Sequence, residues 1–332
     1  MSRPLVITFS GMGAQWPQMG TDLLNIPIFR ETVERCHEVL KSKNVDLIHI
    51  ITTKNLEVVD NILNAMVGSA VVQIGMANIL KELKFEPDFL FGPSFGEIGC
   101  GYYDGCLTEE QAILAAYYRG LVCLKGVSIK GAMVFIHAGL KDIKPLVPKG
   151  IEAPCSYNSS ACLVGGPEDL LKEFIRTLGK INISAMLVNS CGMPFHTSYL
   201  SDLRPILISH LEKVIPDPKK RSEKWKSTSV PIEKWGVEGE YCSAEYYTNN
   251  FCGDVYYEET CCTLPKNCIT LEIGPTGQLF KLIEGNLPKG THLALGQKGN
   301  LEAVKVFLDG LKEARSHGVQ FDFERLATIM DY

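Results

Sequence analysis

The segment Gly92-Pro93-Ser94-Phe95-Gly96 constrains the fold more than any other part of this chain. It follows the apolar run Phe89-Leu90-Phe91 and precedes a segment that we predict to be helical. A serine between two glycines at a strand-to-helix turn is the nucleophile-elbow pattern. The glycines let a strained backbone turn sharply without Cβ clashes, and the helix behind it presents free N–H groups to developing negative charge. The pattern predicts an α/β fold with a hydrolase-like parallel-sheet core, and an acyl-transfer enzyme in which Ser94 forms a covalent intermediate.

Length and charge exclude several classes of protein. The 332 residues are 45% hydrophobic, which is enough for one large α/β domain with an insertion or for two domains. A net charge of −5 and a pI near 5.9 argue against general nucleic-acid binding. The start of the chain lacks the order of a signal peptide, and the longest apolar stretch, 67–80, is shorter than a membrane span and carries polar residues. We expect a cytoplasmic protein with no membrane span.

The twelve cysteines are irregularly spaced and contain no CxxC pair. Cys261 and Cys262 are adjacent, with Cys252 and Cys268 isolated nearby. A zinc cluster normally shows closely paired ligands, and a disulfide framework belongs to exported chains. We therefore predict reduced, mostly buried thiols and no metal site.

Residues 130–189 differ in pattern from the rest of the chain. The hydrophobic periodicity predicts two helices, at 141–146 and 167–178, among four strands at 132–138, 152–157, 161–165 and 184–188. This βαββαβ order is the ferredoxin-like pattern. We predict that it forms a small subdomain inserted into a large α/β body made of residues 1–129 and 190–332.

The body itself shows further periodic segments. We expect strands at 5–9, 227–231, 268–273 and 293–296. Helices are expected at 59–83, 107–125, 196–214, 243–263 and 300–316.

A serine nucleophile needs a base, and the chain offers seven histidines. Most of them have a simpler interpretation: those at 37, 210 and 317 lie on helices with charged neighbours, and those at 49 and 137 lie in apolar runs. His196 differs, because it follows Cys191-Gly192-Met193-Pro194-Phe195, a loop broken by glycine and proline between a strand and a helix. Catalytic side chains are often carried by such loops at the rim of a sheet. His196 is therefore the candidate base.

Six segments resemble the acyltransferase domain of animal type I fatty acid synthase, the malonyl/acetyl transferase, and they occur in that family's order. They are Phe9–Trp16, Gly92–Leu107, Ala115–Gly120, Gly192–His196, Ser243–Tyr246 and Leu271–Ile273. The resemblance covers residues 3–325 approximately, which is nearly the whole chain. It implies transfer of malonyl and acetyl groups from CoA to the phosphopantetheine thiol of an acyl carrier protein in fatty acid synthesis. Malonyl-CoA, acetyl-CoA, a carrier protein and other fatty acid synthase domains are the implied partners, and no separate cofactor is needed.

The resemblance also implies a role for particular residues. Ser94 is the nucleophile and His196 the base, and the backbone N–H groups of Gln15 and Phe95 form the oxyanion hole. Arg119 would hold the free carboxylate of malonate, although from the pattern alone it reads as a helix arginine paired with an acid such as Glu97. A backbone carbonyl in the segment matching Asn249-Asn250-Phe251 orients the histidine, and Asn250 is the predicted residue. We expect the hydroxyl, the imidazole and the guanidinium to converge on one crevice.

Three positions depart from the family's pattern. Pro93 stands where the family nearly always has a histidine that lines the pocket, Asp254 where a proline is common, and Thr197 where a serine is usual. Phe195, before the catalytic histidine, fits malonyl-type pockets. Pro93 and Phe195 are thus the predicted pocket residues, and Pro93 changes the pocket's chemistry.

Two other functions stay open. One is a catalytically weakened or inactive copy of a fatty-acid-synthase domain, suggested by Pro93. The other is a simple serine esterase, which shares the Ser94–His196 pair but has no need of Arg119.

Overall fold

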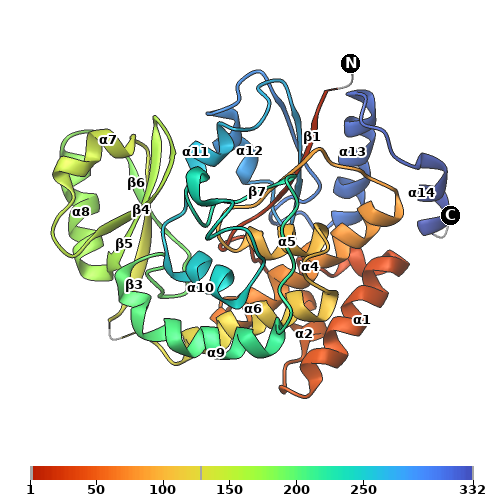
Figure 1. Ribbon diagram of the computed structural model, residues 1–332, viewed down its shortest axis with the longest axis horizontal. Helices are drawn as coiled ribbons and strands as arrows, with labels where there is room; N and C mark the ends of the chain where they lie inside the picture. The colour runs from red at the N-terminus through yellow and green to blue at the C-terminus, as the bar shows by residue number, and fades with distance from the viewer. Residues whose placement is uncertain (1–2, 128, 331–332) are drawn as a thin grey trace.

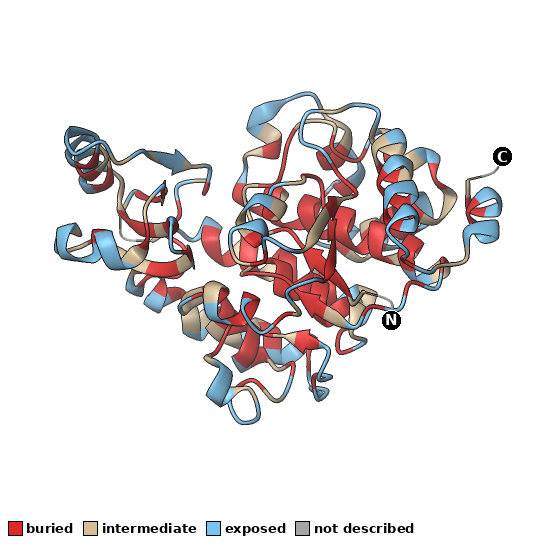
Figure 2. Cartoon of the chain, turned by 90° about the horizontal axis from the view of Figure 1, so that it is seen from above, coloured by how far each residue is buried: buried red, intermediate tan, exposed pale blue. Residues whose placement is uncertain are grey.

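The computed structural model describes residues 3–127 and 129–330. It contains two sheets, and the smaller one forms a separate lobe on one side of the body (Figure 1). Buried residues concentrate in the central strands of the body and in the helices beside them, while the outer faces are exposed (Figure 2).

The body is built on a five-stranded sheet in the order β7-β2-β1-β8-β9, in which every neighbouring pair is parallel. Its strands are β1 (Leu5–Phe9), β2 (Phe89–Phe91), β7 (Trp225–Lys226), β8 (Ile269–Ile273) and β9 (Thr291–Ala294). β1 and β8 are buried at every position, as expected of continuous apolar strands covered on both faces. The predicted α/β fold with a parallel-sheet core is confirmed.

Helices surround this sheet. They are α1 (Pro27–Lys41), α2 (Leu47–Thr52), α3 (Leu56–Val59), α4 (Ile62–Glu82), α5 (Gly96–Tyr103), α6 (Glu109–Leu124), α9 (Arg204–Val214), α10 (Ala244–Cys252), α11 (Tyr257–Cys261), α12 (Leu279–Glu284), α13 (Ala303–Ser316) and α14 (Phe323–Ile329). Among the described residues, α4 alone is long and apolar enough to cross a membrane, but it is the central helix of the core and most of it is buried inside the protein.

The small sheet has the strand order β4-β5-β3-β6 and is antiparallel throughout. Its elements are β3 (Gly131–Ile136), α7 (Leu140–Ile143), β4 (Glu152–Asn158), β5 (Ala161–Pro167), α8 (Glu168–Lys180) and β6 (Ala185–Val188). The element order is the expected βαββαβ, and α8 packs on the sheet with its own cluster of apolar residues around Leu171 and Phe174. The antiparallel small subdomain is therefore present as predicted.

The helix predicted at 243–263 is divided into two helices in the structure. The segment 243–263 divides into α10 and α11, because Gly253 takes an extended conformation, with φ −91° and ψ 175°, directly after Cys252. The carbonyl of Gly253 thus leaves the direction of the helix. The predicted helix at 196–214 similarly begins with a 3₁₀ turn at Ser198–Leu203 before α9 starts at Arg204.

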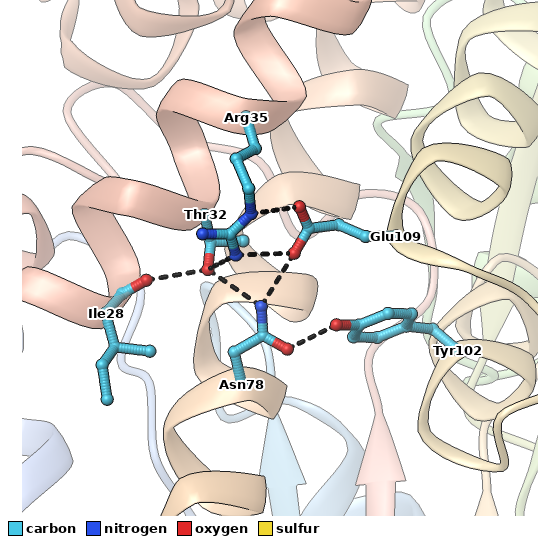
Figure 3. A network of polar contacts seen from close by, with 6 residues as sticks. All are labelled: Ile28, Thr32, Arg35, Asn78, Tyr102 and Glu109. Atoms are coloured by element: carbon cyan, nitrogen blue, oxygen red, sulfur yellow. Dashed lines mark hydrogen bonds and ion pairs between the residues drawn. The ribbon is translucent and has the colours of Figure 1, made fainter.

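A polar network fixes four helices of the body to one another (Figure 3). Glu109 of α6 pairs with Arg35 of α1 at 2.8 Å and accepts a 2.9 Å hydrogen bond from Asn78 of α4. The Asn78 amide also donates to Thr32 of α1 and accepts from Tyr102 of α5. α5 follows Ser94 and α6 carries Arg119, so this network holds the two site-bearing helices in register.

The N-terminus of α6 gives a test of this architecture. Thr108 accepts a hydrogen bond from the Gln111 N–H while the Gln111 side chain accepts one from the Thr108 N–H, which is a complete capping box. Thr108→Ala should lower the free energy of unfolding in urea by about 1 kcal/mol, because it removes a cap. Thr177→Ala is the matched control, since Thr177 is exposed inside α8. Wild-type stability in Thr108→Ala would contradict the capping role.

Candidate active site

The turn that carries Ser94 is sharp and depends on its two glycines. Ser94 has φ +55°, a left-handed conformation that a serine adopts only when its surroundings enforce it. A Cβ on Gly92 would lie 2.6 Å from the Gly96 carbonyl oxygen, and one on Gly96 would collide with the backbone carbonyl of Phe9. β1, β2 and α5 therefore meet at van der Waals distance, and this contact presents Ser94 at the end of the sheet.

Ser94 and His196 are 102 positions apart in the chain and meet in space. Ser94 Oγ lies 2.6 Å from His196 Nε2, and His196 Nδ1 lies 2.9 Å from the carbonyl oxygen of Gly253. A carbonyl only accepts, so Nδ1 carries the ring proton and Nε2 is left to accept the serine proton. This is the tautomer that a general base needs.

Burial sets the protonation state of this histidine. His196 is 6% exposed, and burial lowers its pKa to about 4 against the opposing effect of its bond to Gly253. The positive charge of Arg119 contributes to the same lowering of the pKa. The imidazole is therefore neutral at physiological pH and ready to take a proton.

The prediction that Asn250 supplies the orienting carbonyl is wrong. The acceptor is Gly253, three positions later. Asn250 lies inside α10, and the carbonyl that reaches His196 belongs to the residue at which the helix breaks. A glycine just beyond a helix is a frequent stop signal, so the sequence did contain a clue to this position.

Arg119 is buried and has no acidic partner in the part of the chain that the structure describes. It is 2% exposed, and its Nη2 donates to the Tyr247 carbonyl at 3.0 Å and to Asn250 Oδ1. Among the described residues no carboxylate lies within ion-pair distance of it, and its Nε has no hydrogen-bond partner. Burial lowers its pKa to about 10, so it remains charged at pH 7. The alternative pairing of Arg119 with Glu97 is not formed.

A cavity of about 770 Å³ opens between the body and the small subdomain. Ser94, His196, Pro93 and Phe195 all line it, as does the loop 10–14 that follows β1. The opposite wall comes from the small sheet, through Met133, Phe135, His137, Leu163 and Met186–Val188. The site is thus a largely apolar cleft with the serine–histidine pair on one side.

The other predicted site residues are not among those that line the cleft. Arg119 does not line the cavity but lies 5.9 Å from the ring centroid of Phe251, which packs edge-on against Phe195 at 5.9 Å. Gln15 and Phe95 are buried, at 3% and 1% exposure. Neither of their backbone N–H groups donates a hydrogen bond within the described part of the chain, so no internal acceptor occupies them.

The Gln15 side chain shapes its own loop. Its Oε1 accepts from the Gly13 N–H at 3.1 Å, and its Nε2 contacts the sulfur of Cys191 at 3.8 Å. Gly13 takes φ +88°, a conformation that suits glycine. These contacts connect the opening loop to the segment that leads to His196.

All twelve cysteines are free, and all but Cys191, Cys252 and Cys262 are buried. Within residues 3–127 and 129–330, no group of three or more His, Cys, Asp or Glu side chains is arranged to hold a metal ion.

Comparison with known proteins gives the family. The acyl transferase domain model matches residues 6–309, so the chain belongs to the acyl transferase domain family. The highly reducing polyketide synthase gloL of Glarea lozoyensis is 25% identical over 349 residues, covering 97% of this chain and 13% of that protein. The 6-methylsalicylic acid synthase of Aspergillus terreus is 29% identical over 205 residues, covering 61% of this chain and 11% of that protein. The chain spans a small part of the length of these relatives.

Solved structures share the fold. The acyltransferase domain from the second module of the salinomycin polyketide synthase has a TM-score of 0.83 at 21% identity, covering 97% of this chain and 76% of that one. The malonyl CoA-acyl carrier protein transacylase from Clostridium perfringens has a TM-score of 0.76 at 18% identity, covering 94% and 98%. At these identities the likeness concerns the fold alone.

These findings support the expected family only in its broader form. The motifs resemble the acyltransferase domain of animal fatty acid synthase, but the relatives named above are fungal polyketide synthases. Membership is therefore shown for acyl transferase domains of the polyketide and fatty acid synthase type, without a preference for animal fatty acid synthase.

The pKa of His196 gives a testable pH dependence. Only the neutral imidazole can accept the Ser94 proton. His196 becomes protonated from solvent, and so loses this ability, as the pH falls through its pKa of about 4. The rate of acyl-ester formation on Ser94 should be constant from about pH 8 to about pH 6 and should fall about tenfold per pH unit only below the lowered pKa. Rapid-quench measurement, with circular dichroism to verify folding, tests this. A midpoint near 6.5, the ordinary value for histidine, would contradict it.

Proposed function

We propose that this protein transfers malonyl, and also acetyl, from CoA to the phosphopantetheine thiol of an acyl carrier protein through an ester on Ser94. One arrangement carries the proposal: a hydroxyl 2.6 Å from a neutral imidazole, at the wall of a cleft, close to a buried guanidinium that no carboxylate neutralises. A serine–histidine pair supplies acyl transfer in general, and the unpaired positive charge favours an acyl group that itself carries a carboxylate.

The first half-reaction would form the ester. His196 Nε2 takes the proton from Ser94 as Oγ attacks the thioester carbonyl, and the backbone N–H groups of Phe95 and Gln15 receive the oxyanion. Loss of one such donor typically costs about 2.7–4 kcal/mol of barrier. The C–S bond then breaks, and His196 returns the proton to the departing CoA thiol.

The second half-reaction reverses these roles. His196 takes the proton of the carrier's phosphopantetheine thiol, whose sulfur attacks the ester carbonyl. The C–O bond to Ser94 breaks, and His196 gives the proton back to Oγ. Both halves exchange an ester and a thioester, so the reaction needs no ATP, metal or further cofactor. The apolar cleft would limit the access of water, which otherwise turns a transferase into a hydrolase.

The pathway in which the protein acts and the residues that shape its acyl pocket are also proposals. The motif resemblance favours a role in fatty acid synthesis, in the cytoplasm and together with other synthase domains. The names of the fungal relatives instead indicate polyketide synthesis. Either setting supplies a carrier protein. Pro93 lines the cleft where the family has a histidine, and Phe195 lines it beside His196, so both would shape the acyl pocket.

Labelled malonyl-CoA separates the proposal from its two alternatives. Wild-type protein should hold a stable label that chases onto a phosphopantetheinylated carrier protein, and Ser94→Ala should hold none because the nucleophile is gone. The label is measured by intact-protein mass spectrometry. Rapid release of free malonate would identify an esterase instead, and an unlabelled, folded wild type would identify an inactive copy.

Arg119→Ala tests the carboxylate contact. Malonyl transfer should fall about 100-fold or more, since a buried charge-assisted pair with the substrate is lost, while acetyl transfer should change far less. Steady-state kcat/KM for both CoA esters gives the comparison. Equal losses for the two acyl groups would refute the role of Arg119 in holding a carboxylate.

A further inference from the structure

We infer that Asn250 is a positioning residue that holds Arg119 with a neutral amide oxygen and so reserves the guanidinium charge for the carboxylate of the acyl group. The inference rests on the proposed function, which it deepens by assigning a determinant of acyl selectivity. Asn250 is 1% exposed and its side-chain oxygen accepts a hydrogen bond from Arg119, so it would act by positioning the guanidinium.

Arg119 is held entirely by neutral acceptors of α10. These are the backbone carbonyl of Tyr247 and the side-chain oxygen of Asn250. The rings of Tyr247 and Phe251 lie 5.6 Å and 5.9 Å from the guanidinium carbon. One helix therefore fixes the position of the charge without cancelling it.

The orientation of the Asn250 amide follows from Arg119, whose guanidinium only donates. Oδ1 therefore faces Arg119, and Nδ2 donates to Ser229 Oγ at 2.9 Å. An amide turned the other way would place its NH₂ group against the guanidinium, two donors face to face. Ser229 is fixed in turn by the bond from its N–H to Ser227 Oγ, which lies 2.7 Å from the Tyr246 hydroxyl. The donor-only guanidinium thus leaves a single orientation for Asn250, which the Ser229 hydroxyl accommodates.

The buried carboxylate of Glu97, whose charge acts on Arg119, is already hydrogen-bonded to other groups. Glu97 accepts from Trp225 Nε1 at 2.6 Å, from the Tyr246 hydroxyl at 2.7 Å, and from both the N–H and the hydroxyl of Thr228 at 2.5 Å and 2.8 Å. Four donors from the protein saturate it. Arg119 thus remains a buried cation with neutral neighbours, which is an arrangement that attracts an anion.

A carboxylate at position 250 would neutralise the charge of Arg119 without changing the size of the side chain. Aspartate has the size of asparagine, and the Ser229 hydroxyl can rotate to donate to it. It would pair with Arg119 inside the protein, where charge–charge attraction is stronger than in water. A malonyl carboxylate would then compete with an internal anion, whereas acetyl, which has no charge, would not.

The experiment measures kcat/KM of wild type and Asn250→Asp with malonyl-CoA and acetyl-CoA. We expect the ratio of malonyl to acetyl transfer to fall by about tenfold or more, since the variant neutralises the anion-binding charge. Asn61→Asp is the matched control: Asn61 is the exposed N-cap of α4, where aspartate caps equally well, and it adds the same net charge. Its ratio should equal that of wild type.

Each other outcome has a defined meaning. An unchanged ratio in a folded Asn250→Asp, or an equal loss with both substrates, overturns the inference and leaves Asn250 with a structural role only. If thermal unfolding shows that Asn250→Asp is not folded, Asn250→Ala replaces it. In Asn250→Ala the KM for malonyl-CoA should rise while the KM for acetyl-CoA stays constant. An unchanged KM for malonyl-CoA would overturn the inference. A wild type that transfers no malonyl would instead contradict the proposed function.

Discussion

The buried carboxylate of Glu97 is the contact on which the site's geometry depends. It lies on α5, three residues after Ser94, and accepts hydrogen bonds from β7 through Trp225, from the segment after β7 through Thr228, and from α10 through Tyr246. Hydrogen bonds to a charged group are worth about 1.5–3 kcal/mol each, and an unsatisfied buried carboxylate is costly. α10 and α5, the helix that follows Ser94, are thereby held together, and α10 in turn leads to Gly253, whose carbonyl is bonded to His196.

Burial lowers the pKa of two ionisable groups of the site, His196 and Arg119, yet leaves them in opposite charge states. Burial disfavours the charged form of each, and this is enough to make His196 neutral, with a pKa of about 4, but not to discharge Arg119, with a pKa of about 10. Their proximity reinforces the difference, because the guanidinium charge opposes protonation of the imidazole. A neutral base beside a fixed cation suits a reaction in which negative charge develops on the substrate.

Much of the architecture was predictable because its signals are local. The elbow of glycines around Ser94, the apolar strands at 5–9 and 268–273 and the βαββαβ periodicity of 130–189 each depend on neighbouring residues, and these elements formed as expected. Predicted boundaries erred where a backbone turn interrupts a periodic segment. The segment 243–263 is the clearest case, because its composition continues through Gly253 whereas its helix does not.

The sequence alone determined the candidate nucleophile, Ser94, and its candidate base, His196, because a strained turn and a broken loop are marked by glycine and proline. Only the tertiary structure decided that Ser94 and His196 lie 2.6 Å apart, that Gly253 rather than Asn250 orients the imidazole, and that Arg119 meets neutral acceptors instead of Glu97. These pairings join segments far apart in the chain. Which donor reaches which acceptor is set by how helices pack, and no local pattern of residues encodes that.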